Sequence, residues 1–229
     1  MVLISHIYKF IYIKNKKVGG TSVESFFGQF CVDPKKTYNF PHKQKAKISK
    51  FGIIGCRAVN IKNTKWKPHA SATKIMKKMK NMNMGNKFNK YTKFCVVRNP
   101  YDVEVSKYYW YNRKKKKDDG TYSISFKDWV RKVKNANTNF RIFSINGKSV
   151  CDYYIRYENL QEDIIKLCKI LNITDYNIND LPSLKSNVRD KEKHYSEFYD
   201  EETRKIVYEK YKKEFDLFGY KFEKQEENK

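Results

Sequence analysis

The sequence has no long hydrophobic run. None of its apolar stretches reaches the roughly 18–20 uninterrupted residues that span a bilayer, and the apolar segment 1–13 is interrupted by His6 and Lys9. The same segment has no small-residue cleavage pattern, which distinguishes it from a signal peptide. We therefore expect no membrane association, and we expect these residues to form a strand of the core.

Cysteine is sparse and irregularly spaced. The cysteines number five, an odd count, and none stands in a CxxC pair. This pattern argues against a disulfide scaffold or a zinc site, and it predicts a reducing compartment. The four histidines are also dispersed. Because no cluster of histidine, cysteine or carboxylate residues stands out in the sequence, we expect no metal site.

Two common glycine motifs of nucleotide-binding proteins are missing. The sequence contains no G-x4-GK[ST] loop and no G-x-G-x-x-G turn. The hypotheses that the protein is an ATPase or a Rossmann dehydrogenase therefore lack their main sequence evidence. An unusual nucleotide kinase stays open as an alternative, and a test of ATP binding would decide it.

Acidic residues are about half as numerous as basic ones. Lys and Arg total 49 against 25 Asp and Glu, which gives a formal net charge of +24. Such an excess suggests an anionic partner, although a solvated lysine surface explains it equally well. The 229 residues are 40% hydrophobic and 16% aromatic. This composition supplies the core of one domain and excludes a wholly disordered chain.

Hydrophobic patterning predicts strands that alternate with helices. Strands are expected over 7–14, 51–56 and 91–97, with a hairpin of 142–145 and 150–155 around Asn146-Gly147. Helices are expected over 21–30, 69–82, 102–113, 125–133, 158–171 and 200–215. This order predicts an α/β fold, a single domain with a central, mainly parallel sheet flanked by helices. We place the domain at 1–224 and a disordered tail at 225–229.

The segment after the first strand predicts an anion-binding loop. Two glycines, Gly19 and Gly20, stand between the strand and a helix that begins near Thr21. Glycines let the backbone approach a ligand, and the amide groups of a helix N-terminus attract negative charge. Lys17 adds a positive charge, and Ser22 a hydroxyl group. An ordinary strand–helix turn is the alternative for this segment taken alone.

A second strand end carries a similar signal. Arg98 follows the strand predicted over 91–97, and Ser106 lies eight residues further on, in the next predicted helix. An arginine there can form a fork on a phosphate. The alternative makes Arg98 a surface ion-pair partner and Ser106 a bystander. Taken together, the two segments favour a ligand with two separated phosphate-type groups at the carboxyl ends of parallel strands.

These segments resemble the sulfotransferases that use 3'-phosphoadenosine-5'-phosphosulfate (PAPS). Lys17-Val18-Gly19-Gly20-Thr21-Ser22 is similar to their phosphosulfate loop, and Arg98-Asn99-Pro100-Tyr101-Asp102 with Ser106 to their 3'-phosphate motif. Weaker likeness continues through 156–160, 198–203 and 218–220. The resemblance covers nearly the whole chain and is nearest to the small, single-domain, carbohydrate-type sulfotransferases. It implies their P-loop-like fold.

The resemblance also implies roles for individual residues. Transfer of the sulfuryl group from PAPS leaves 3'-phosphoadenosine-5'-phosphate (PAP) and requires no metal. The residues implied to bind the 5'-phosphosulfate are Lys17, Val18, Gly19, Gly20, Thr21 and Ser22, and those implied to bind the 3'-phosphate are Arg98 and Ser106. Lys17 would assist the leaving group in an in-line transfer, and His69 would act as general base. Asn187 and Arg189 are weaker candidates for closing over the nucleotide.

The sequence leaves the acceptor and the detail of the 3'-phosphate motif open. Glu104 departs from the family pattern, because it brings a negative charge close to the presumed 3'-phosphate motif. The acceptor is expected to be a carbohydrate, or another hydroxyl-bearing molecule that could itself be anionic. The alternative is a basic nucleic-acid-binding protein with this fold and no transferase activity. With no membrane anchor in the sequence, a cytoplasmic enzyme of bacterial or viral type, or an excised catalytic domain, is expected.

Overall fold

A computed structural model describes residues 1–58, 66–115, 121–182 and 193–223. The chain divides into two compact units. Unit 1 comprises Met1–Val97 and Asn139–Leu184, and unit 2 comprises Arg98–Thr138 and Lys185–Lys229. The prediction of one domain over 1–224 stays a prediction, and the expected tail over 225–229 lies outside the described residues.

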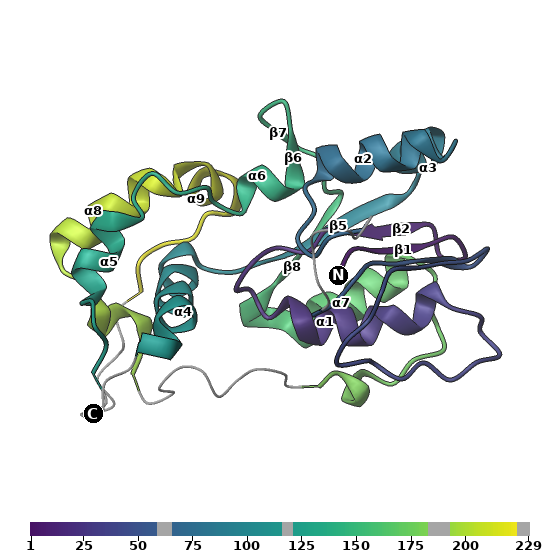
Figure 1. The fold of residues 1–229 in the computed structure, drawn as a ribbon, viewed down its shortest axis with the longest axis horizontal. Coiled ribbons are helices and arrows are strands. Elements are labelled where there is room, and N and C mark those ends of the chain that lie inside the picture. Colours follow the sequence, from purple (N-terminus) through teal and green to yellow (C-terminus); the bar gives the residue numbers. More distant parts are fainter. Residues whose placement is uncertain (59–65, 116–120, 183–192, 224–229) are drawn as a thin grey trace. The chain divides into compact units, whose positions relative to one another are not determined.

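Unit 1 is built on a six-stranded sheet (Figure 1). Its strands, in spatial order, are β3 (Lys47–Ile48), β4 (Gly52–Ile54), β1 (Leu3–Ser5), β2 (Phe10–Tyr12), β5 (Thr92–Val97) and β8 (Tyr153–Arg156). The pairs β2–β5 and β5–β8 are parallel, whereas β1–β2, β1–β4 and β3–β4 are antiparallel. The α/β class is confirmed. The sheet is mixed rather than mainly parallel, because short turns join β1 to β2 and β3 to β4, and only antiparallel strands can be joined that way.

The amino-terminal strand differs from its prediction. Where one strand was expected over 7–14, the chain forms a hairpin in which Leu3 pairs with Tyr12. Lys9 adopts a φ of 52° in the turn between the strands. A non-glycine residue rarely takes this conformation, and no glycine or proline marks the turn, so the apolar run indicated one continuous strand.

Helices lie on both sides of this sheet (Figure 1). Helices α1 (Gly20–Gly28) and α7 (Leu160–Ile170) are on one side, and α2 (Ala72–Asn81) and α3 (Gly85–Lys90) on the other. A short helix α6 (Phe140–Phe143) leads into the hairpin of β6 (Ser144–Ile145) and β7 (Lys148–Ser149). Asn146 and Gly147 form its turn with φ of 50° and 76°, as their sequence predicted. The arms expected over 142–145 and 150–155 were wrong in part, since the hairpin ends at Ser149 and Tyr153–Arg156 pairs with β5 instead.

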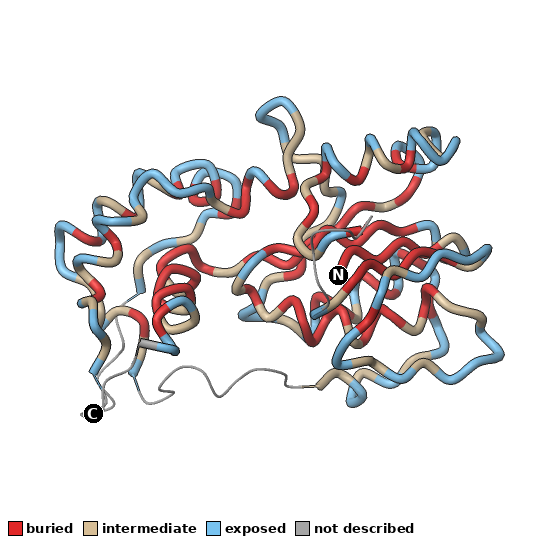
Figure 2. Tube along the Cα trace, viewed as in Figure 1, coloured by how far each residue is buried: buried red, intermediate tan, exposed pale blue. Residues whose placement is uncertain are grey.

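Where α1 meets the sheet, the chain of unit 1 is largely buried (Figure 2), and the core there is aromatic. Phe27 of α1 lies 4.9 Å from Phe94 of β5 and 5.6 Å from Phe10 of β2, measured between ring centroids. All three side chains are fully buried. Edge-to-face and tilted rings of this kind add to the stabilisation from apolar burial, and they fix α1 directly beneath the two parallel strands.

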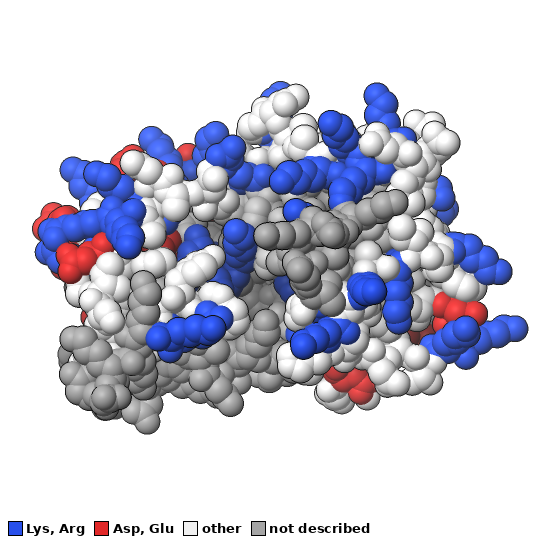
Figure 3. Space-filling model, in the orientation of Figure 1, with Lys and Arg blue, Asp and Glu red and all other residues white. Residues whose placement is uncertain are grey.

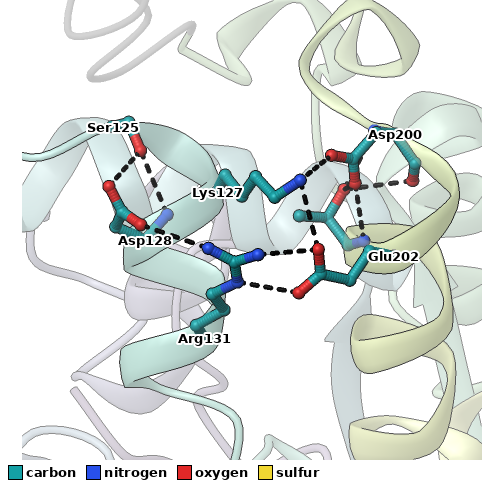
Figure 4. A network of polar contacts seen from close by, with 7 residues as sticks. Ser125, Lys127, Asp128, Arg131, Asp200 and Glu202 are labelled. Atoms are coloured by element: carbon teal, nitrogen blue, oxygen red, sulfur yellow. Dashed lines mark hydrogen bonds and ion pairs between the residues drawn. The ribbon is translucent and has the colours of Figure 1, made fainter.

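Unit 2 is helical. It contains α4 (Pro100–Asn112), α5 (Phe126–Lys132), α8 (Glu201–Lys210) and α9 (Lys212–Phe218). The last two replace the single helix expected over 200–215, because the helix is interrupted at Tyr211, which ends α8 and precedes α9. Ion pairs join α5 to the start of α8: Lys127 contacts Asp200 at 2.8 Å, and Arg131 contacts Glu202 at 2.7 Å (Figure 4). In the described part of the chain, no helix is long and apolar enough to cross a membrane.

One buried carboxylate joins three segments of unit 1. Glu24 of α1 is fully buried, and its Oε2 accepts from Lys14 at 2.6 Å and from Arg57 at 2.9 Å. Lys14 lies just after β2, and Arg57 follows β4. A buried charge is tolerated only when paired, so Glu24 holds both cations against α1.

We expect Glu24→Ala to lower the free energy of unfolding by about 3–5 kcal/mol, because it leaves buried cations without their counter-charge. Urea unfolding followed by circular dichroism measures this change. Glu209→Ala, at an exposed position of α8, is the control and should cost less than about 0.5 kcal/mol. Equal effects of the two substitutions would contradict the role of Glu24.

Candidate functional site

The loop between β2 and α1 is held by asparagine side chains. Asn15 is buried, and its Nδ2 donates to the Val96 carbonyl oxygen of β5 at 2.9 Å. The Asn139 Oδ1 accepts from the Lys16 backbone amide at 2.9 Å, and the Asn139 Nδ2 donates to the Lys16 carbonyl at 3.0 Å. The backbone before Lys17 is thus fixed by side-chain hydrogen bonds that link it to distant parts of the sequence.

The two glycines lie where a side chain would not fit. Gly19 caps α1 with a φ of 71°, and a Cβ atom there would lie 2.7 Å from the Tyr157 ring. A Cβ atom on Gly20 would lie 2.6 Å from the Tyr12 hydroxyl, which donates to the Gly20 carbonyl oxygen at 3.0 Å. Lys17 also has a positive φ, of 60°. The glycines are therefore required by the fold of this loop.

The amino end of α1 is suited to an anion. Among the described residues, no side chain caps this helix. Val18, Thr21 and Ser22 are buried beside it, and the Ser22 amide bonds to the Gly19 carbonyl oxygen at 3.1 Å. Uncapped amide groups at a helix N-terminus, with the adjacent Lys17, form a local positive potential. The anion cradle expected from the sequence stays a prediction, and it would lie at this helix end.

His69 lies close to the root of this loop. It precedes α2 instead of opening it, because Ser71 is the N-cap, and its φ is 53°. Its Nδ1 lies 3.1 Å from the Lys14 carbonyl oxygen. A carbonyl only accepts, so Nδ1 carries the proton and Nε2 is the basic nitrogen. Burial, followed by the nearby Lys14 charge, lowers the pKa of His69 to about 3. The imidazole is therefore neutral at pH 7.

Arg98 and Ser106 belong to unit 2. Arg98 immediately follows β5, and its guanidinium contacts Asp102, with Nε at 2.7 Å and Nη2 at 2.5 Å from Oδ2. Asn99 caps α4 by accepting from the Tyr101 amide at 3.1 Å. Ser106 is half-buried on α4, four residues after Asp102, and residues at this spacing share a helix face. Asn187 and Arg189 lie outside the described residues.

Glu104 faces away from Arg98. It is fully buried, and its carboxylate accepts from the Tyr211 hydroxyl at 2.7 Å, from Lys210 at 2.9 Å and from the Trp129 indole at 3.0 Å. Burial alone would raise the pKa of Glu104, but the Lys107 and Lys210 charges outweigh it, and the pKa is lowered. The negative charge that departs from the family pattern is neutralised inside the helical unit.

A model of the sulfotransferase family matches residues 1–221, a range that contains both the loop and the Arg98 segment. The chain belongs to the sulfotransferase family. An uncharacterized protein of Archaeoglobus fulgidus is 33% identical over 87 residues, which cover 36% of this chain and 68% of that protein. No solved structure matches the chain.

Sulfotransferase membership implies the use of PAPS. The loop of unit 1 fits the phosphosulfate end of this donor, because its glycines let a phosphate approach the backbone. PAPS supplies an activated sulfuryl group when bound. In the described part of the chain, no cluster of His, Cys, Asp or Glu could hold a metal ion.

Some residues of the candidate donor loop were not predicted from the sequence. Asn15, Asn139 and Tyr157 all contact the loop or its root. Asn139 stands 123 residues from Lys16, and nothing in the residues around it points to the loop. Asn15 stands within the predicted loop, but its partner in β5 follows only from the strand order.

We expect Gly19→Ala to weaken PAP binding about tenfold or more, because a Cβ atom clashes with Tyr157 and the loop must shift. Isothermal titration calorimetry measures this change. Gly147→Ala is a matched control, since Gly147 also has a positive φ, of 76°, but has nothing within 4 Å of its Cβ position. If both variants bound PAP like the wild type, the loop would not be the nucleotide site.

Proposed function

We propose that this sulfotransferase transfers the sulfuryl group of PAPS to a hydroxyl group of a carbohydrate acceptor. One observation carries the proposal: the Lys14 carbonyl, at the root of the candidate donor loop, accepts from His69 Nδ1 at 3.1 Å. A base with a fixed tautomer and an anion-binding loop thus share one segment of backbone. A hydroxyl acceptor needs both a base and a bound donor.

The loop residues would bind the 5'-phosphosulfate. The amide groups from Val18 to Thr21 would hold its oxygens, and the Thr21 and Ser22 hydroxyl groups would add donors. Lys17 would offset the negative charge that develops on the leaving oxygen. Because the loop is fixed by Asn15 and Asn139 before any ligand binds, little reorganisation would accompany the reaction.

The Arg98 segment would recognise the 3'-phosphate. Its guanidinium is planar and bidentate, and the Ser106 hydroxyl is an additional donor. The 3'-phosphate distinguishes PAPS from ordinary adenine nucleotides. Asn187 and Arg189 are proposed to close over the nucleotide.

His69 would remove the proton of the acceptor hydroxyl through Nε2. A pKa of about 3 makes the free imidazole a weak base. An anionic donor close by would raise the pKa of His69, since an opposite charge stabilises the imidazolium. The proton would then be accepted most readily when the donor is in place.

The basic surface bears on the choice of acceptor. On the face drawn in Figure 3, Lys and Arg side chains lie over many elements and form no single stripe. On α2 alone, Lys74, Lys77 and Lys80 are exposed. The scattered distribution on this face argues against a nucleic-acid groove. The net charge of +24 favours an acceptor that is itself anionic, such as an acidic saccharide.

We expect PAP to bind much more tightly than 5'-AMP or ATP, and both Lys17→Ala and Arg98→Ala to weaken PAP binding by about 10–100-fold, since each removes a charge-assisted hydrogen bond. Calorimetric titration measures these affinities. Lys80→Ala and Arg204→Ala, at exposed positions of α2 and α8, are charge-matched controls and should bind PAP normally.

No preference for PAP over 5'-AMP would refute the proposed donor. Salt-dependent binding of DNA or RNA that is insensitive to PAP would instead support the nucleic-acid-binding alternative.

We expect His69→Ala to lower kcat by about 10²–10⁴-fold while PAP affinity is retained, because the base acts on the acceptor. Transfer of ³⁵S from labelled PAPS to a panel of oligosaccharides measures kcat. His42→Ala, at an exposed position, is the control. An unchanged kcat in His69→Ala would exclude this residue as the base.

The pH profile gives an independent check. His69 Nε2 is unprotonated above a pKa of about 3, and kcat/KM reports the free enzyme. We therefore expect His69 to cause no loss of kcat/KM between about pH 8 and about pH 5, and a loss only as the pH falls towards its pKa. An acidic limb near the ordinary histidine pKa of about 6.5 that disappears in His69→Ala would contradict the buried environment.

A further inference from the structure

Three quarters of the net charge comes from one segment of the sequence. Between Asp33 and Asp102 the chain contains 16 Lys and 2 Arg and no Asp or Glu, so this segment contributes +18 of the net charge of +24. It includes α2, and on the face drawn in Figure 3 no acidic side chain of the described residues lies over this helix. The cations of α2 therefore have no acidic neighbours in the sequence, and an anion from outside the protein can supply the missing charge.

Three of these lysines come together in unit 1. Lys74 and Lys78 are one turn apart on α2 and share a helix face. Lys78 is half-buried, and its Nζ lies 5.3 Å from the ring centroid of the buried Trp66. Burial lowers the pKa of Lys78, although Cys56 opposes this effect. The charges of Lys67 and Lys74 lower the same pKa further, so the three ammonium groups lie close together. We call Lys67, Lys74 and Lys78 the lysine cluster.

The lysine cluster has no counter-charge of its own. In the part of the chain that the structure describes, none of its three lysines forms an ion pair, whereas the nearby Lys14 and Arg57 both pair with Glu24. Like charges repel one another, and an opposite charge within about 4–6 Å favours the charged form of each lysine. A cation–π contact with Trp66 holds Lys78 in position. An anion bound among the three ammonium groups would replace repulsion by attraction.

The lysine cluster lies at the same edge of the sheet as the candidate donor loop. Strand β1 is antiparallel to both β2 and β4, so β2 and β4 run in the same direction and end at one edge. Lys14 follows β2 there, and Cys56 follows β4. The Cys56 amide donates to the Trp66 carbonyl oxygen at 2.9 Å, which places Trp66 and the cluster at this edge. His69 donates to the Lys14 carbonyl oxygen and follows Lys67 by two residues.

We infer that the lysine cluster binds a sulfate or phosphate monoester group carried by the acceptor. Both groups are tetrahedral anions with several terminal oxygens, and each ammonium group can donate to a different oxygen. Lysine acts as a compact point charge, whereas the planar fork of an arginine favours a bidentate partner. The inference rests on the proposed function for identifying the ligand as the acceptor, but anion binding at the cluster requires neither donor nor transfer.

Trp66 provides a reporter for the experiment, because the chain has three tryptophans and the Trp66 ring lies next to Lys78. The indole ¹H–¹⁵N signals of the full chain are followed during titration with glucose 6-sulfate, glucose 6-phosphate and glucose. Saturating PAP is present to occupy the donor loop, and Trp66→Phe assigns the signal. We expect the monoesters to shift the Trp66 signal in a saturable manner and glucose to leave it unchanged. The signals of Trp110 and Trp129 in unit 2 are internal references.

Variants of the lysine cluster test which side chains bind the anion. We expect Lys74→Ala and Lys78→Met each to weaken monoester binding about fivefold or more, since each removes a charge-assisted hydrogen bond. PAP affinity should remain that of the wild type. Lys80→Ala is the matched control, because Lys80 is an exposed lysine of the same helix and residues two apart on a helix do not face each other. This variant should bind the monoesters like the wild type.

The outcomes separate this inference from the proposed function. Normal PAP binding without a saturable shift of the Trp66 signal overturns the inference and leaves the proposed function intact. A saturable shift in a chain that does not bind PAP supports the anion site while the proposed function fails. Equal weakening by Lys80→Ala, or loss of the shift in Lys17→Ala, overturns the inference, because the anion then binds through general charge or at the donor loop. A response to only one of the two monoesters supports the inference and identifies the group.

Discussion

The parallel pairing of β2 with β5 is the constraint on which the candidate donor site depends. Because the two strands run in the same direction, the loop that follows β2 and the chain that follows β5 leave the sheet at the same edge. The hydrogen bond from Asn15 to the Val96 carbonyl joins these strand ends directly. An antiparallel arrangement would remove this carbonyl from the reach of Asn15 and leave the loop without its anchor.

Local features of the sequence predicted the loop well. The glycine pair, the strand before it and the helix after it all follow from short-range rules, and the structure agrees with them. The anchors of the loop were beyond such rules, since Asn139 contacts Lys16 across 123 residues. The turn at Lys9 was missed for a different reason: its backbone is set by the pairing of β1 with β2, which overrides the extended preference of the surrounding residues.

Glu104 and His69 show which side-chain positions helical periodicity can and cannot predict. Glu104 stands two residues after Asp102, and residues at that spacing project to opposite sides of a helix. Its position away from Arg98 was therefore implicit in the sequence. Its partners, Trp129 on α5, Lys210 on α8 and Tyr211 directly after α8, were not. His69 shows the opposite case. Proline at 68 suggested a helix start, but Ser71 is the N-cap, and a turn with positive φ brings His69 to the Lys14 carbonyl.

If Arg98 binds the 3'-phosphate as we propose, its contact with Asp102 has a consequence for selectivity. The guanidinium already contacts a carboxylate in the structure, so an incoming anion would meet a paired cation rather than an isolated one. A singly charged group would gain less there, because Asp102 repels it while Arg98 attracts it. A phosphate with two charges can still prevail through its additional oxygens and bidentate geometry. The pair would thus favour doubly charged over singly charged anions. Added salt would weaken this preference, because it screens both charges.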